Sequence, residues 1–295
     1  MTLEQLRIFV TVAQLEHVTQ AAQRLNLTQA AVSASIATLE AQHRVKLFDR
    51  VGRNIALTTA GHLFLAEAQA VLARSAAAQA VLHDYAGLQH GSLNVAASQT
   101  LASYYLPAIV VAFYKLHPGF RIQLQIGNTA QVMRHVTQGE VELGFVEGLL
   151  SGASLHVEPI ATEHMVIVVP PDHSWAAGQS LSDADLRGAD WVFREPGSGS
   201  REAFLSALAK RGIDESALKI ALTLPSNEAV REAVVHGAGA ACLSPLVCER
   251  ALEAGVLHTA NWQLPPRLFH AVRHKDRYVS KAAIAFLDLA QQQTR

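Results

Sequence analysis

Cysteine, aromatic side chains and net charge are all scarce in this chain of 295 residues. Its two cysteines, Cys242 and Cys248, lie in an apolar stretch, so we expect buried free thiols. The 24 Lys and Arg side chains are balanced by 25 Asp and Glu, which excludes a strongly basic chain. No apolar run is long enough to span a bilayer and no signal peptide precedes Leu3, which predicts a cytoplasmic protein without a membrane partner.

Motifs of catalysis are also missing. Ser98, Ser200 and Ser244 have no nucleophile-elbow context, and the glycine-rich segment 194–201 is not a Walker motif because no lysine follows its last glycine. The fourteen histidines are scattered and provide no set of metal ligands. We therefore expect no enzyme, no metal and no cofactor other than a small-molecule effector.

Residues 17–40 have the pattern of a helix-turn-helix. Ala21 and Ala22 lie on one face of a short helix and allow a close crossing with a second helix. Thr28 is a good N-cap for that second helix. We expect Leu27 to close the corner, and the apolar side of the second helix to comprise Ala31, Val32, Ile36 and Leu39. An ordinary helical hairpin inside a helical domain is the alternative.

The outer face of this second helix is short and polar near its start, which suits a helix lying in the major groove of DNA. The residues expected there are Thr28, Gln29, Ala30, Ser33 and Ser35. The following basic segment, 44–53, and a return strand at 54–58 predict a small wing, with Phe48 anchoring it on the helices. Arg50 and Arg53 would then reach phosphates or the flanking minor groove, whereas a solvated basic loop is the alternative.

Residues 1–91 carry a net charge of only +1, with seven Lys and Arg against six Asp and Glu. Affinity for DNA then requires duplication of the module in an oligomer. An alanine-rich segment at 59–86 offers a heptad seam between subunits, formed by Gly61, Ala68, Ser75 and Leu82 with Phe64, Val71, Ala78 and Tyr85. A helix that packs on its own domain is the alternative. We expect 90–92 to form a hinge.

From Leu93 onward short apolar strands alternate with helices, which predicts two α/β lobes. The first has strands at 93–97, 122–126 and 143–146 and helices at 101–116 and 130–138. The second comprises 165–170, 191–193, 201–211, 219–222, 228–236 and 240–243, and the chain returns to the first through 268–273 and a helix at 281–292. This is the architecture of periplasmic solute-binding proteins, in which a ligand binds between the lobes.

Hydroxyl and amide side chains stand at four of the predicted helix starts. Together with free N–H groups at the positive end of each helix dipole, they would suit a small anion if they converge on one cleft. The expected effector-binding residues are Ser98, Gln99, Thr100, Asn128, Thr129, Glu147, Arg194, Gly197, Ser198, Gly199, Ser200, Ser226 and Asn227. Ordinary helix capping explains any single one of them equally well.

The chain resembles the LysR-type transcriptional regulators over essentially its whole length. The family's opening pattern is matched by 3–9, 19–22, 27–33, 39–40, 47–50 and 57–61. The resemblance implies a multi-domain fold: a winged helix-turn-helix DNA-binding domain at 1–58, a linker and dimerisation helix with hinge at 59–91, and an effector-binding domain at 92–295. Within that domain, lobe I is expected at 92–162 and 267–295, and lobe II at 163–266.

The resemblance also implies partners. These are double-stranded DNA at an inverted repeat, a second copy in a dimer, a dimer of dimers, and RNA polymerase. The segments 194–201 and 226–230 resemble the branch that includes regulators of sulfur assimilation and carbon fixation, which implies a small oxyanion, or a carboxylate or phosphate metabolite, as effector. Many members have proline, arginine and glutamine where this chain has Ala30, Ala34 and Ser35, so operator preference does not carry over.

Replacing Gln29 and Arg53 together by alanine should weaken retention of operator-containing genomic fragments in a gel at low salt. The Gln29 side chain is expected to contact base edges in the major groove, and the Arg53 side chain is expected to contact phosphates or the flanking minor groove. Unchanged retention of every fragment would contradict the helix-turn-helix assignment.

Overall fold

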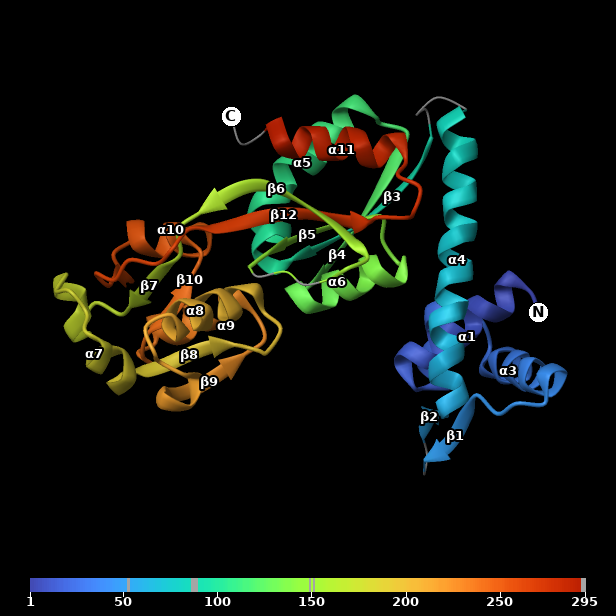
Figure 1. Ribbon diagram of the computed structural model, residues 1–295, viewed down its shortest axis with the longest axis horizontal. Helices are drawn as coiled ribbons and strands as arrows, with labels where there is room; N and C mark the ends of the chain where they lie inside the picture. The colour runs from blue at the N-terminus through green and yellow to red at the C-terminus, as the bar shows by residue number, and fades with distance from the viewer. Residues whose placement is uncertain (52–53, 86–89, 149, 151, 293–295) are drawn as a thin grey trace. The chain divides into compact units, whose positions relative to one another are not determined.

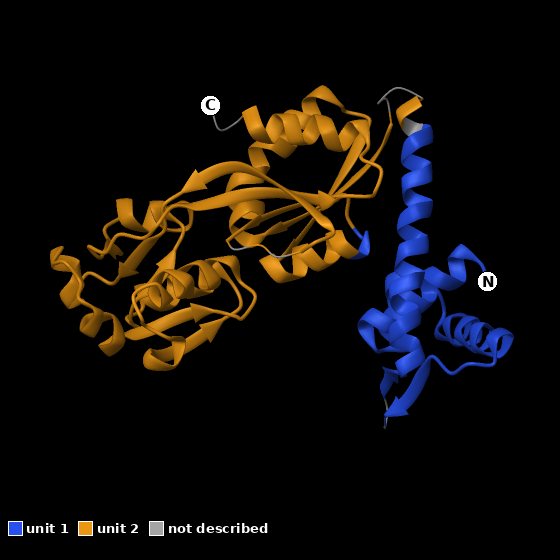
Figure 2. Cartoon of the chain, in the orientation of Figure 1, with its two compact units in different colours: residues 1–82, 138–140 blue, residues 83–137, 141–295 orange. Residues whose placement is uncertain are grey.

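The computed structural model describes residues 1–51, 54–85, 90–148, 150 and 152–292. They form two compact units, one of residues 1–82 with 138–140 and one of residues 83–137 with 141–295 (Figure 2). Among the described helices, none combines the length and the apolar character needed to cross a membrane.

The first unit is a winged helix-turn-helix followed by a long helix (Figure 1). Its elements are α1 (Leu3–Leu15), α2 (Val18–Leu25), α3 (Gln29–His43), the antiparallel strands β1 (Phe48–Val51) and β2 (Asn54–Leu57), and α4 (Thr59–Tyr85). Ala21, Ala22 and Val32 are buried where the first three helices meet, which confirms the predicted close crossing. The Thr28 hydroxyl accepts a hydrogen bond from the backbone N–H of Ala31 at 3.2 Å, so Thr28 is the N-cap of α3 as predicted.

Two predicted core positions of this motif lie at the surface. Leu27 is 38% exposed, because Asn26 takes a left-handed conformation (φ 54°) that ends α2 and turns the chain outward. Ala31 is also exposed. It precedes the buried Val32 by one position, which rotates it by about 100° around the helix axis.

The carboxylate of Glu40 joins the recognition helix α3 to the wing. It accepts hydrogen bonds from the backbone N–H groups of Leu47 at 2.8 Å and Phe48 at 3.2 Å. It also forms an ion pair with the Lys46 ammonium at 2.8 Å. Burial alone would raise the pKa of Glu40, but the Lys46 ammonium and the two N–H groups together lower the pKa below its ordinary value. Phe48 then packs on Phe9, with 5.5 Å between the ring centroids, and so anchors the wing as predicted.

The first turns of α4 pack on their own unit and do not form the predicted seam between subunits. A Cβ at Gly61 would lie 2.2 Å from the Leu47 carbonyl oxygen, so only glycine allows this approach of α4 to the wing. The rings of Phe64 and Phe9 pack against each other with 4.8 Å between their centroids, and Ala68 is buried in the same core. The seam prediction is therefore wrong for Gly61, Phe64 and Ala68, where the alternative of a helix packed on its own domain applies.

The second unit contains a five-stranded sheet in the order β4-β3-β5-β12-β6. Its strands are β3 (Gly91–Ser98), β4 (Phe120–Gly127), β5 (Leu143–Glu147), β6 (Leu155–Glu163) and β12 (Arg267–His274). The helices are the π-helical turn η1 (Leu101–Tyr105), α5 (Leu106–Leu116), α6 (Thr129–Gln138) and α11 (Lys281–Gln292). α5 and α11 share one core with the sheet, and α6 belongs to another. We call this sheet with its helices lobe I.

Lobe II is built on the strand sets β10-β7-β11 and β8-β9, which a bridge between Trp191 and Ala240 connects. Its strands are β7 (Val166–Val169), β8 (Asp190–Arg194), β9 (Lys219–Leu224), β10 (Ala241–Leu243) and β11 (His258–Thr259). Its helices are η2 (Ser174–Ala177), α7 (Asp183–Gly188), α8 (Gly199–Ala209), η3 (Glu215–Ala217), α9 (Asn227–Val235) and α10 (Pro245–Glu253). Trp191 is fully buried among aromatic neighbours.

The predicted strands and helices of both lobes are present in the predicted order, but β6, α7, α10 and β11 were not predicted. One boundary was also misplaced. Gly91 and Ser92 were expected in a hinge, but both belong to β3, where they pair with Phe120 and Arg121 of β4. A Cβ at Gly91 would lie 2.8 Å from the Phe120 ring, so the glycine lets that ring pack on the strand. The absence of a side chain at Gly91 therefore allows close packing of Phe120 in the sheet and does not create a hinge.

Replacing Glu40 by glutamine should lower the free energy of unfolding by about 2 kcal/mol, because charge-assisted hydrogen bonds are stronger than neutral ones. Since folding lowers the pKa of Glu40, its contribution is complete above the ordinary value of 4.5 and is lost as the pH falls through the lower folded value. Urea unfolding at pH 7 and at pH 3 measures both effects. The exposed Glu67 provides the control Glu67→Gln; equal losses in the two variants would contradict the role of Glu40.

Candidate functional site

The predicted DNA-reading residues lie around the start of α3 and on the wing. Thr28, Gln29, Ala30 and Ser33 are exposed, whereas Ser35 is half-buried and so less accessible than predicted. Arg50 is exposed in β1, and Arg53 lies outside the described residues. The open face of α3 is thus made of small side chains, which allows close approach of the helix backbone to another surface.

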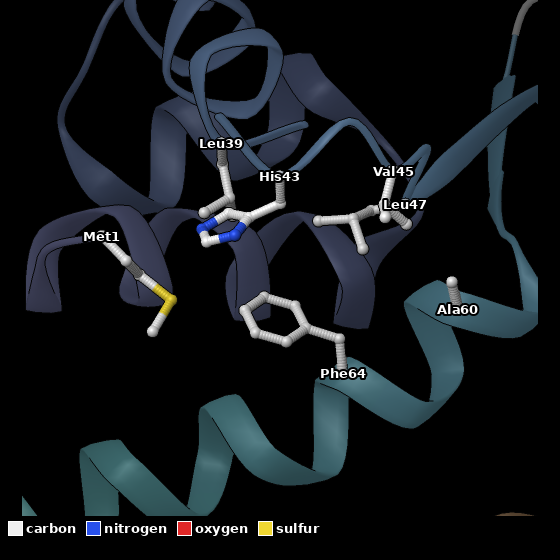
Figure 3. Close-up of a pocket in the computed structure, with 7 residues that line it drawn as sticks. All are labelled: Met1, Leu39, His43, Val45, Leu47, Ala60 and Phe64. Carbon is white, nitrogen blue, oxygen red and sulfur yellow. The ribbon is translucent and has the colours of Figure 1, made fainter. Parts of the chain in front are cut away.

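An apolar pocket of about 280 Å³ lies beside α3 in the same unit (Figure 3). Its lining comes from the end of α3, the segment before the wing, the chain start and the first turns of α4: Met1, Leu39, His43, Val45, Leu47, Ala60 and Phe64. Met1 and Val45 at its edge are 61% and 42% exposed. Further along α4, Leu82 and Tyr85 are 70% and 89% exposed. This unit therefore presents considerable apolar surface to solvent.

The predicted effector-binding residues come together where lobe I meets lobe II. In lobe I they follow the parallel strands β3, β4 and β5, and in lobe II the parallel strands β8 and β9. The carboxyl ends of parallel strands and the helix starts beyond them form the ligand-binding edge of such sheets. Most of the thirteen side chains are buried, including Ser98, Thr100, Asn128, Thr129, Glu147, Arg194, Ser198, Ser200 and Asn227.

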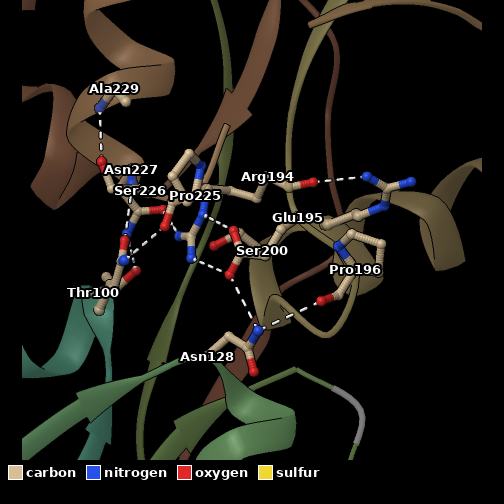
Figure 4. Close-up of polar contacts among 12 residues, drawn as sticks. Thr100, Asn128, Arg194, Glu195, Pro196, Ser200, Pro225, Ser226, Asn227 and Ala229 are labelled. Atoms are coloured by element: carbon tan, nitrogen blue, oxygen red, sulfur yellow. Dashed lines mark hydrogen bonds and ion pairs between the residues drawn. The ribbon is translucent and has the colours of Figure 1, made fainter. Parts of the chain in front are cut away.

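Arg194 and Asn227 are at the centre of the contacts between the lobes (Figure 4). The buried Arg194 guanidinium donates to the Asn227 side-chain oxygen and to both carboxylate oxygens of Glu195, at 2.8 and 2.9 Å. The Asn227 side-chain amide donates to the Thr100 hydroxyl of lobe I at 3.0 Å. Asn227 thus joins the start of α9 to lobe I, and Arg194 holds the Asn227 side chain in place. Its charge is neutralised by Glu195, a partner that the sequence reasoning did not assign.

The loop before α8 makes the second set of contacts between the lobes. Asn128 of lobe I donates to Glu195 at 3.2 Å (Figure 4). The Ala130 N–H donates to the Gly197 carbonyl at 3.2 Å. A Cβ at Gly199 would lie 2.3 Å from the Glu147 carbonyl oxygen. The glycine thus allows the backbone of this loop to lie close to lobe I.

Ordinary capping explains some of the predicted residues and not others. The Ser226 hydroxyl accepts from the Ala229 N–H at 3.0 Å and acts as the cap of α9. By contrast, Thr100 and Ser198 precede helices without capping them through their side chains. The Ser98 hydroxyl donates instead to the carboxylate of Glu147, which is 2% exposed. Polar groups here therefore exceed what capping requires.

A further bridge between the lobes combines the predicted residues Gln99 and Asn227 with Tyr104 and Glu228, which the sequence reasoning missed. Gln99 accepts from the Asn227 N–H at 3.0 Å and donates to the Pro225 carbonyl at 2.9 Å, and beside it the Tyr104 hydroxyl donates to Glu228 at 3.1 Å. Burial, and then the Glu228 charge, raise the pKa of Tyr104. Tyr104 lies in the π-helical turn η1, a geometry that often marks functional positions. Nothing in the local sequence pattern distinguishes η1 from the start of α5.

Both cysteines are buried free thiols, as predicted. Burial raises the pKa of Cys242 and raises that of Cys248 to about 12. Because the thiolate is the reactive form, neither side chain is chemically activated in this fold.

Replacing Asn227 by alanine should lower the free energy of unfolding by about 2 kcal/mol, because it removes the hydrogen bonds that the Asn227 side chain makes with the buried Arg194 guanidinium and with the buried Thr100 hydroxyl. Chemical denaturation measures the loss. Asn261→Ala is the matched control, since Asn261 also donates hydrogen bonds but is exposed. If both variants lose the same stability, Asn227 does not hold the lobes as described.

The sequence and the structure both match known proteins. Residues 3–62 match the bacterial regulatory helix-turn-helix protein, lysR family, and residues 86–295 match the LysR substrate binding domain. The uncharacterized HTH-type transcriptional regulator YeiE of Escherichia coli K12 is 34% identical, with 97% of this chain and 96% of that protein covered. The probable RuBisCO transcriptional regulator of Synechocystis is 34% identical (97% and 84%), and CysL of Bacillus subtilis is 31% identical (89% and 88%).

Solved structures agree in fold. CbnR, a LysR family transcriptional regulator, superposes with a TM-score of 0.69 at 22% identity over the full length of both chains. The regulatory domain of CcmR from Synechocystis superposes with a TM-score of 0.64 at 23% identity, covering 70% of this chain and 98% of that one. The winged helix-turn-helix, the two lobes and the sequence matches lead to one conclusion: the chain belongs to the LysR family of DNA-binding transcriptional regulators with an effector-binding domain.

Proposed function

We propose that this regulator responds to a small anionic effector bound at the junction of lobes I and II. The supporting observation is that N–H donors of two helix starts meet oxygen atoms of the opposite lobe there. Ala130 N–H donates to the Gly197 carbonyl, and Asn227 N–H donates to the Gln99 side-chain oxygen. An anion with several oxygens replaces these acceptors and gains the favourable end of the helix dipoles.

The charged side chains at the junction indicate which class of effector would bind there. Arg194 is paired with Glu195, whose side chain is 26% exposed and can turn out toward solvent. A carboxylate or oxyanion of the effector then takes the place of the Glu195 carboxylate on the guanidinium. The proposed binding residues are those predicted from the sequence: Ser98, Gln99, Thr100, Asn128, Thr129, Glu147, Arg194, Gly197, Ser198, Gly199, Ser200, Ser226 and Asn227.

Solved structures of relatives with bound small molecules support a small effector. The CcmR regulatory domain was solved in complex with 2-PG, and the effector-binding domain of QuiR with shikimate, a carboxylate. The RuBisCO and CysL regulators belong to the branch expected from the sequence. A small oxyanion, or a carboxylated or phosphorylated metabolite, is therefore the effector that we propose.

On the DNA side, we propose that α3 enters the major groove and that the wing contacts the backbone. The proposed contacts are Thr28, Gln29, Ala30, Ser33, Ser35, Arg50 and Arg53. Crystals of full-length CbnR in complex with its target DNA support a DNA-bound state for this fold. With so little net positive charge in this part of the chain, two copies must bind together for useful affinity.

The uncovered apolar surface supports assembly with further copies. Leu63, Val71, Leu82 and Tyr85 are exposed on α4, and the apolar pocket beside α3 lies at the same helix (Figure 3). We propose that α4 pairs with α4 of a second copy and places two α3 helices on an inverted repeat. β4 and β9 are edge strands of the effector domain, and exposed apolar side chains at and near them support pairing of dimers into a tetramer.

In this proposal the effector changes the angle between lobes or subunits, and thereby the DNA bend and contact with RNA polymerase. The protein acts on DNA in the cytoplasm and performs no catalysis.

Calorimetry of the full chain against sulfite, phosphate and small carboxylates should detect at least one ligand. Thr100→Ala should weaken that binding about tenfold, the loss of roughly one hydrogen bond to a charged group. Thr137→Ala, an exposed threonine of α6, should leave it unchanged. Binding of neutral aromatic compounds alone, unaffected by Thr100→Ala, would contradict the proposal.

A further inference from the structure

Arg267 and Glu163 form a buried ion pair where the chain crosses between the lobes. β6 ends at Glu163 and β12 begins at Arg267, and the two residues are directly opposed in the antiparallel register. Their side chains are 9% and 5% exposed. An ion pair at this point fixes the two crossover strands to each other as they leave lobe I.

Two serines of lobe II bind this ion pair. The Arg267 guanidinium donates to the Ser200 hydroxyl at 3.0 Å, and the Ser244 hydroxyl donates to the Glu163 carboxylate at 2.6 Å. Ser200 lies in the first turn of α8, Ser244 is the N-cap of α10, and both are 1% exposed. The ion pair therefore sets where two helices of lobe II begin relative to the crossover strands.

The first turn of α8 also lies close to lobe I. Gly199, next to Ser200, lies against the Glu147 carbonyl and the Thr129 hydroxyl, which a Cβ would approach to 2.3 and 2.5 Å. Anything that enters between these groups displaces α8. Since Ser200 moves with α8, Arg267 receives that displacement directly.

The far end of β12 leads to the last turn of α4. β12 ends at His274, and the Tyr278 hydroxyl and Lys281 N–H that follow it both donate to the Asp84 carboxylate, at 2.6 and 2.9 Å. Asp84 is 5% exposed and is the penultimate residue of α4. Ser280 between them donates to Glu142, so two carboxylates satisfy the N–H groups at the start of α11.

We propose that Arg267 is a positioning residue that ties the first turn of α8 to β12, and that β12 carries a displacement of α8 to the Asp84 carboxylate at the end of α4. β12 suits this role because strands β5 and β6 hydrogen-bond to it on both sides. The inference rests on the proposed function in placing the effector at the lobe junction. Arg267 itself acts behind that junction, through Ser200.

Gly199→Ala tests the connection without any effector. The added Cβ pushes α8 away from Glu147, and hydrogen exchange of the full chain is then followed at the N–H groups of residues 280–284, which report on the Asp84 contact. We expect exchange there to be about threefold faster or more in Gly199→Ala. Adding Ser200→Ala, which removes the hydroxyl bound by Arg267 but keeps the ion pair, should abolish this increase.

Ser206→Ala, in the same helix, is the matched control and should leave the increase intact. Arg267→Met combined with Gly199→Ala is the second variant and should behave as the Ser200→Ala combination does. No increase in Gly199→Ala, or an equal increase with and without Ser200→Ala, would overturn the inference. Because no ligand is used, either result leaves the calorimetric test of the anionic effector independent.

Discussion

The first N–H groups of a helix have no partner within that helix, and at three helices of this chain some of them are satisfied by groups from a distant segment. At α6 the partner is the Gly197 carbonyl, and at α9 it is the Gln99 side chain, each supplied by the opposite lobe. At α11 the partners are the Asp84 and Glu142 carboxylates. A helix start that depends on another segment for its hydrogen bonds also responds when that segment moves.

Local features of the sequence were sufficient to predict most of the elements, although β6, α7, α10 and β11 were missed. The alternation of apolar strands and helices after Leu93 and the N-cap at Thr28 are decided by neighbours within a few residues, so periodicity and capping chemistry identify them. The basic segment 44–53 and the strand pattern that follows it further identified the wing. The convergence of the effector-domain helix starts was only a condition of the sequence interpretation, and parallel strands fulfil it by bringing their carboxyl ends to one edge.

Interactions between distant segments were not predictable in the same way. A heptad repeat at Gly61, Phe64 and Ala68 has the same appearance whether its partner is a second copy or the chain's own α1, and only the fold decides. The pairing of Arg194 with Asn227, and of Arg267 with Glu163, depends on which side chains meet when the chain folds. Buried charged pairs of this kind are evident in the structure, but their residues do not recur at a regular spacing in the sequence that would identify them.

The contact of Gly61 with the Leu47 carbonyl makes the first turns of α4 a rigid extension of the wing. α4 has 27 residues, which at 1.5 Å per residue is about 40 Å of helix. When a straight helix of this length tilts by about 5° about one end, its other end moves by about 3.5 Å. This distance is roughly the spacing of one base pair. A small tilt of α4 at its C-terminal end therefore corresponds to a displacement of several ångströms at its N-terminal end, where the helix contacts the wing.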